Sequence, residues 1–270
     1  MHELLLALTA GAYLTAAVLL YFSMRNASTA TRKAAIALTS AGVLAHLVTQ
    51  YAVWFAPTAR QVSILDVLSL CALVTVALLM ASLTFRKSLF EAGLLALPIA
   101  GMALLLEWLI PVPTPGVGNS SPAITGHVFT SVLAFGVLSI AGVYAIFVAV
   151  IDHFLRRHHL NRLVRTLPAL DVLEGLLFQL ITAGFIILTV SLATGLVFVN
   201  DLFAQHLVHK TVLSIFAWLV FGTLLWGRQF RSWRGRVAVR LTLAGIGLLL
   251  LSYFGSKLVL EVLLGQSWQA

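Results

Sequence analysis

The chain has 270 residues, of which 60% are hydrophobic and 10% charged, and its mean hydropathy is +1.02. Soluble globular domains carry about 25% charged residues, so this composition excludes a water-soluble protein and indicates an integral membrane protein. The net charge of +8 comes from basic residues in short clusters between apolar runs. Such clusters are the orientation signal of membrane proteins, and they argue against nucleic acid as a partner.

Eight apolar runs are long enough to cross a bilayer, whose hydrocarbon core of about 30 Å needs about 20 residues of helix. Neither internal repeats nor a domain linker interrupts them, and the Pro/Gly/Ser-rich segment 111–122 is interpreted as a loop. We therefore predict an all-α bundle that forms a single transmembrane domain over residues 1–270. The predicted spans are 4–24, 34–55, 64–84, 90–110, 123–151, 174–199, 209–227 and 238–263.

Basic residues mark alternate loops of this predicted bundle. Of the 17 Lys and Arg residues, 14 follow the first, third, fifth or seventh span. By the positive-inside rule these loops face the cytoplasm, so both termini face outward. The expected location is the bacterial inner (plasma) membrane, with the lipid bilayer as the surrounding partner. The three exceptions, Arg60, Lys210 and Lys257, lie on or near the outer side.

The second and third spans carry polar residues within apolar sequence. His46 lies about nine residues below the outer end of its span, roughly 13 Å deep, where an ionisable side chain is costly unless paired. It is either a ligand or a neutral structural histidine that Thr49 or Gln50 hydrogen-bonds. The acids Asp66 and Glu107 lie near outer helix ends, where we expect water to reach them.

Cys71 is the chain's single cysteine, and no CxxC or CxxCH motif is present. An internal disulfide and a covalent haem attachment site are therefore excluded. We interpret Cys71 as a small apolar packing residue.

Histidines also begin two of the later spans at their outer ends. His127 begins the fifth span, His209 begins the seventh, and His206 lies one turn before His209 on the same face. Two imidazoles at one depth on separate helices can ligate a porphyrin from both sides. We predict a non-covalent, b-type haem whose iron binds His127 and His209, with His46 or His206 as the alternative second ligand.

Two outer cations fit the same hypothesis, because haem propionates are anionic. Lys210 adjoins His209 and is the expected propionate partner. Lys257, in the outer third of the last span, either serves in the same way or is a snorkelling side chain that pairs with Glu261.

Several segments resemble a known family. "GHVFTSVLAFGVLSIAGVYA", "GFIILTVSLATGLVF", "HKTVLSIFAWLVFGTLLWGRQFRSWRGR" and "YFGSK" are similar to the cytochrome c assembly protein family, in its CcsA/HemX-like branch and the YpjD type of inner-membrane protein. The similarity covers most of the chain and is strongest from about residue 123 to 261. It implies eight spans with outward termini and a role for His127, which matches the family's helix-opening periplasmic histidine.

The chain also departs from the family pattern. Haem-handling members carry a tryptophan-rich segment in an outer loop, whereas the corresponding loop here reads "VNDLFAQHLVHK". The histidine that follows "YFG" in the family has no counterpart. The resemblance therefore implies an auxiliary haem-binding protein rather than a full haem ligase. The expected partners are cytochrome c assembly proteins or another inner-membrane protein.

Two other functions remain open at this point. The first is a scaffold or partner subunit that keeps the fold without a cofactor. The second is a metal-ion or small-solute transporter, which would need discontinuous helices and repeated halves. An enzyme is not favoured, because the sequence shows no nucleophile–base pair, phosphate loop or buried carboxylate pair.

Overall fold

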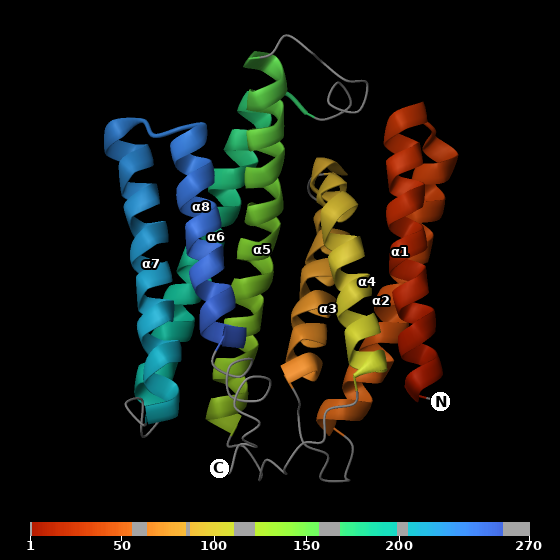
Figure 1. The fold of residues 1–270 in the computed structure, drawn as a ribbon, viewed down its shortest axis with the longest axis horizontal. Coiled ribbons are helices and arrows are strands. Elements are labelled where there is room, and N and C mark those ends of the chain that lie inside the picture. The colour runs from red at the N-terminus through yellow and green to blue at the C-terminus, as the bar shows by residue number, and fades with distance from the viewer. Residues whose placement is uncertain are drawn as a thin grey trace. The chain divides into compact units, whose positions relative to one another are not determined.

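The computed structural model describes residues 2–55, 64–84, 87–110, 122–156, 168–198 and 205–255, and all regular structure in them is helical (Figure 1). The α-helices are α1 (His2–Asn26), α2 (Thr29–Phe55), α3 (Ile64–Ser82), α4 (Gly93–Leu109), α5 (Pro122–Arg156), α6 (Leu170–Phe198), α7 (Gln205–Arg231) and α8 (Arg236–Leu250). A 3₁₀-helix η1 (Lys87–Ala92) precedes α4, and a π-helix η3 (Leu251–Gly255) continues α8.

Each predicted span coincides with one of these helices, which confirms the all-α fold and the eight membrane-spanning segments. The main difference lies in the last span, which leaves α-helical geometry at Leu251 and widens into a π-turn. Residues 256–263 of that span lie outside the described residues. The outward orientation of the termini stays a prediction.

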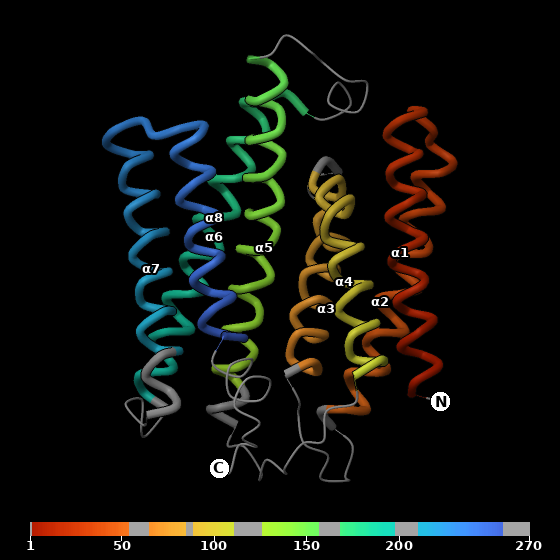
Figure 2. The backbone as a smooth tube through the Cα atoms, in the orientation of Figure 1, coloured from red at the N-terminus to blue at the C-terminus, as the bar shows by residue number. Residues whose placement is uncertain are grey.

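The chain divides into two compact units. The first contains α1 to α4 and the second contains α5 to α8 with η3. Within each unit consecutive helices run in opposite directions, as the tube trace shows (Figure 2). The prediction of one domain over residues 1–270 stays a prediction, and each unit is described by itself below.

In the first unit, α1 packs against α2 and α4, and α3 packs against α4 and α2. The apolar core of these contacts combines small and large side chains, namely Leu6, Ala10, Tyr13, Ala16, Ala17, Val76, Leu97, Ala100 and Leu104. Small residues matter because helices in lipid associate by close van der Waals packing. At Gly101, for example, a Cβ atom would lie 3.3 Å from the carbonyl oxygen of Ala10.

In the second unit, α5 packs mainly against α6 and α8, and α7 packs against α8 and α6. Gly245 on α8 lies against the buried ring of Phe221 on α7, where a Cβ atom would come within 2.6 Å of the ring. Large apolar side chains such as Ile186 and Phe216 are exposed. Because the spans are surrounded by lipid, such exposure needs no covering partner.

A buried polar junction links three helices of the first unit. His46 on α2 is fully buried, with Nδ1 3.3 Å from the Tyr13 hydroxyl of α1 and Nε2 2.9 Å from Ser69 Oγ of α3. Gln50 donates a further hydrogen bond of 2.9 Å to Ser69 Oγ. Ser69 therefore satisfies two buried polar groups of α2, where lipid would offer them nothing.

We expect Ser69→Ala to destabilise the protein, because it leaves His46 Nε2 and the Gln50 amide without their shared partner. The expected loss is about 1–2 kcal/mol, measured as a lower thermal unfolding midpoint in detergent.

The matched control is Ser82→Ala on the same helix, since among the described residues the Ser82 hydroxyl bonds the Leu79 carbonyl of its own helix and no other helix. An equal shift for the two variants would show that the junction contributes nothing of its own.

Candidate functional site

His127 lies near the start of α5, against the last two turns of α6. Its Nδ1 is 3.0 Å from the carbonyl oxygen of Ser191 and 3.3 Å from Thr194 Oγ1. Because a carbonyl can only accept, Nδ1 carries the proton and Nε2 keeps its lone pair. Nε2 makes no hydrogen bond to the described part of the chain, so the ring presents a neutral nitrogen that can bind a metal.

Hydroxyl groups continue this contact between α5 and α6. Ser131, one turn after His127, lies 2.6 Å from Ser191 through the two Oγ atoms, and its hydroxyl also lies 2.8 Å from the His127 carbonyl oxygen. Thr194 donates to the Ser191 carbonyl at 2.9 Å. The helix backbone beside the imidazole is therefore held in place by a set of short polar contacts.

Gly195 makes the room that the imidazole occupies. A Cβ atom at this position would lie 2.9 Å from Cε1 of His127 and 3.4 Å from Nδ1. Real Cβ contacts essentially never come that close, so the ring position depends on a residue without a side chain. The position of His127 is thus set by two hydrogen-bond acceptors, from Ser191 and Thr194, and by Gly195, all on α6.

The start of α7 and the π-helix η3 lie at the end of the second unit where α5 begins and α6 ends (Figure 1). Ser252 donates to the Lys210 carbonyl at 2.8 Å, and Ser214 lies 2.7 Å from Ser252 through the Oγ atoms. Tyr253 and Phe254 pack on Phe135 of α5, with ring centroids 5.4 and 6.0 Å away. The wide π-turn thereby connects α7 to α5 at this end.

The other predicted ligands are only partly described. His206 and His209 belong to the first turn of α7, and their side chains lie outside the described residues. Lys210 lies on α7 next to them, and Lys257 lies outside the described residues. The predicted pairing of His127 with His209 is therefore neither confirmed nor contradicted and stays a prediction.

His46 has a different environment, in the first unit. Both of its ring nitrogens are within hydrogen-bond distance of a hydroxyl group, so either tautomer uses both. The prediction that Thr49 or Gln50 would bond the ring needs correction. Thr49 bonds the His46 carbonyl at 2.8 Å, and Gln50 reaches Ser69. The actual partners, Tyr13 and Ser69, lie on two other helices. Residue spacing in the sequence does not predict which residues of different helices face each other.

Two acids also differ from expectation. Asp66 and Glu107 are 1% and 9% exposed, so they are buried within the chain rather than open to water. Helix packing covers them despite their position near span ends. In the described ranges there is no cluster of three or more His, Cys, Asp and Glu side chains that would hold a metal ion.

Comparison with known proteins places the chain in a family. The model of the cytochrome C assembly protein family matches residues 34–264. No solved structure matches the chain.

Individual relatives agree with that match. Inner membrane protein YpjD of Escherichia coli strain K12 is 36% identical over 145 residues, which are 54% of this chain and 55% of YpjD. The match thus spans about half the length of this relative. A 28.8 kDa protein of Azospirillum brasilense is 31% identical over 70% of this chain and 71% of its own. Cytochrome c biogenesis protein CcsA of Prochlorococcus marinus strain NATL1A is 32% identical over 33% of this chain and 29% of its own. This multi-pass membrane protein belongs to the cytochrome c assembly protein family.

Proposed function

We propose that the chain is an auxiliary haem-handling protein of the bacterial inner membrane, which holds, passes or senses haem. Two kinds of observation support this. The family is that of cytochrome c assembly, and one relative is named a cytochrome c biogenesis protein. Another relative is named an inner membrane protein, which supports the location.

The observation that carries the proposal is the hydrogen bond from His127 Nδ1 to the Ser191 carbonyl. Histidine ligands of metals almost always donate their other ring nitrogen to a carboxylate, carbonyl or water, which sets the tautomer and orients the ring. His127 meets this requirement through a backbone carbonyl of a neighbouring helix. Its donor chemistry fits an axial ligand of haem iron.

The other proposed haem contacts lie mainly on α7. His209 is the proposed second ligand, with His206 as its alternative on the same turn. His46 is the less suitable alternative, because binding iron would cost it one of its two hydrogen bonds. Lys210, and beyond the described residues Lys257, would pair with the propionates. When bound, the haem would supply an iron that can change its oxidation state. The two histidines would hold this iron through their ring nitrogens.

Non-covalent binding follows from the cysteine content, since Cys71 is the only thiol and is buried. The auxiliary role follows from the outer loop before α7, which lacks the family's tryptophan-rich segment. Other cytochrome c assembly proteins or another inner-membrane protein are the proposed partners.

We expect the protein purified in detergent to show a Soret band, either as isolated or after haem addition. The variants His127→Ala and His209→Ala should lose the low-spin spectrum of bis-histidine haem, because each removes one axial nitrogen.

His153→Ala is the matched control, since His153 lies on the same helix as His127, is exposed, and belongs to its other end. Its spectrum should equal that of the wild type. A protein that shows no Soret band even with added haem would contradict the proposal and favour a scaffold without a cofactor.

A second variant tests the glycine that gives His127 its room. Gly195→Ala should weaken haem binding about tenfold or more, because the new methyl group displaces the imidazole from its Ser191 acceptor. Haem titration in detergent measures the affinity.

Gly175→Ala on the same helix is the control, since a Cβ atom there would meet nothing within 4 Å. Equal affinities for the two variants would show that the position of the His127 ring does not determine haem binding.

A further inference from the structure

A small cavity lies in the second unit at the end opposite His127, where α5 ends and α8 begins. Its volume is about 170 Å³. Pockets for drug-sized ligands and cofactors measure about 300–1,000 Å³, so this cavity suits a smaller group. It is lined by Val148, Ala149, Asp152 and His153 of α5, by Gly235, and by Arg236, Val239 and Arg240 of α8.

The lining separates into an apolar part and a charged part. Val148 and Val239 are buried, at 0% and 8% exposure, and lie one helical turn inside Asp152 and Arg236, respectively. The exposed side chains of Arg236 and Arg240 lie on the α8 side. A ligand for this cavity therefore combines an anionic group with an apolar one.

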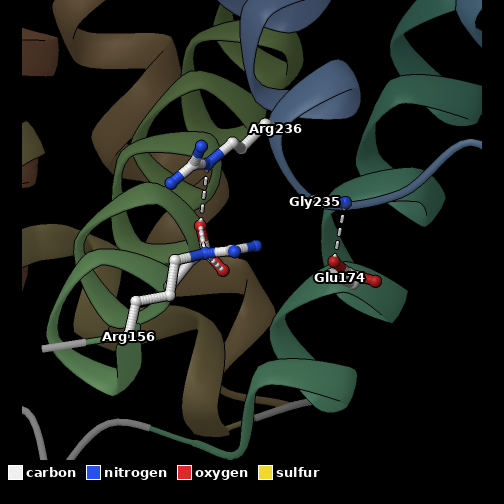
Figure 3. A network of polar contacts seen from close by, with 5 residues as sticks. Arg156, Glu174, Gly235 and Arg236 are labelled. Carbon is white, nitrogen blue, oxygen red and sulfur yellow. Dashed lines mark hydrogen bonds and ion pairs between the residues drawn. The ribbon is translucent and has the colours of Figure 1, made fainter. Parts of the chain in front are cut away.

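Asp152 bonds two arginines, of which Arg236 also lines the cavity. Arg156 donates its Nε–H to both carboxylate oxygens of Asp152 at 3.0 Å, and Arg236 donates its Nε–H to Oδ2 at 3.3 Å (Figure 3). Both contacts use the Nε side of the guanidinium group. Among the described residues the Nη donors of Arg236 bond no acceptor, and its two Nη groups match the oxygens of a phosphate.

The start of α8 is positioned separately from this ion cluster. The buried carboxylate of Glu174 on α6 accepts a hydrogen bond of 2.9 Å from the backbone N–H of Gly235, as Figure 3 shows. Gly235 has φ +54°, a conformation that favours glycine. The chain therefore turns sharply just before Arg236. This turn fixes the backbone position of Arg236 independently of the contact with Asp152.

The charge balance favours an anion. Of the Asp and Arg residues that line the cavity, Arg236 and Arg240 carry two positive charges and Asp152 carries one negative charge. The site lies at the last turn of one membrane span and the first turn of another, which is the level of lipid headgroups. Basic pockets between membrane helices at this level bind the headgroups of anionic lipids.

We propose that this cavity binds the phosphate of an anionic phospholipid. The Nη groups of Arg236 and the side chain of Arg240 hold the phosphate, and Val148, Ala149 and Val239 contact the glycerol and the first methylenes of the acyl chains. The proposal is independent of haem, since the two sites lie at opposite ends of the second unit.

The test uses the full chain, purified in detergent and stripped of lipid. Phosphatidylglycerol or phosphatidylcholine is then added, and bound lipid is counted by native mass spectrometry while the thermal unfolding midpoint is recorded. We expect phosphatidylglycerol, but not phosphatidylcholine, to be retained and to raise the midpoint. Arg236→Gln and Arg240→Gln should each weaken retention about fivefold, because an arginine near the headgroups contributes ~1 kcal/mol to anionic lipid binding.

Arg234→Gln is the matched control. It removes the same charge two residues before Arg236, from an exposed side chain that does not line the cavity. Equal losses for Arg234→Gln and Arg236→Gln, or equal retention of the two lipids, would overturn the proposal. Wild-type far-UV circular dichroism spectra in all three variants would confirm that they fold.

A further experiment distinguishes a lipid phosphate from free inorganic phosphate as the ligand. Inorganic phosphate is added to the lipid-free protein in place of phosphatidylglycerol. If phosphate alone raises the midpoint as far as the lipid does, the lipid part of the proposal is overturned and a soluble anion is the ligand. If phosphate has no effect while the lipid does, the proposal is supported.

Discussion

The hydrocarbon core of a bilayer offers no hydrogen bonds, so every polar group that enters it has to find its partner within the chain. The helices satisfy the backbone. Polar side chains within the spans then need acceptors and donors from neighbouring helices or from their own preceding turn. The described residues follow this rule closely, since hydroxyl groups such as those of Thr39 and Thr242 bond the carbonyl four residues earlier. Other polar side chains bond between helices, as His46 and His127 do.

Two histidines within the spans, His46 and the partly buried His127, show how the same constraint leads to different chemistry. His46 has a hydroxyl group beside each ring nitrogen, which makes it a link between three helices of the first unit. His127 has its acceptors beside one nitrogen, from Ser191 and Thr194, and keeps the other for a ligand. The number of engaged nitrogens separates a structural histidine from a candidate ligand. Depth in the membrane, which first brings His46 to attention, does not separate them.

Charged side chains concentrate at the helix ends, at the level of headgroups and water, where polar groups no longer need a partner within the chain. The Asp152 carboxylate and the guanidinium groups of Arg156 and Arg236 form a cluster at helix ends, and the buried Glu174 serves a backbone N–H at a turn. Exposed ion pairs of this kind contribute little to stability. The position of Asp152 and Arg236 in the lining of a small cavity supports the proposed recognition of an anion. The second unit thus has a neutral nitrogen donor at one end and a cationic cavity at the other.

The sequence by itself determined the membrane class and the helical fold, because apolar length and composition decide whether a segment can cross a bilayer. It also brought His127 to attention, through its place at a span end and through the family resemblance. The partners of that residue were decided only by the tertiary structure. His127 meets a carbonyl 64 residues away, and His46 meets hydroxyl groups 33 and 23 residues away. Such contacts depend on how each helix is rotated about its axis, and in spans that are apolar on all sides no periodic pattern records that rotation. For the same reason Asp66 and Glu107 are buried although their sequence positions favoured contact with water.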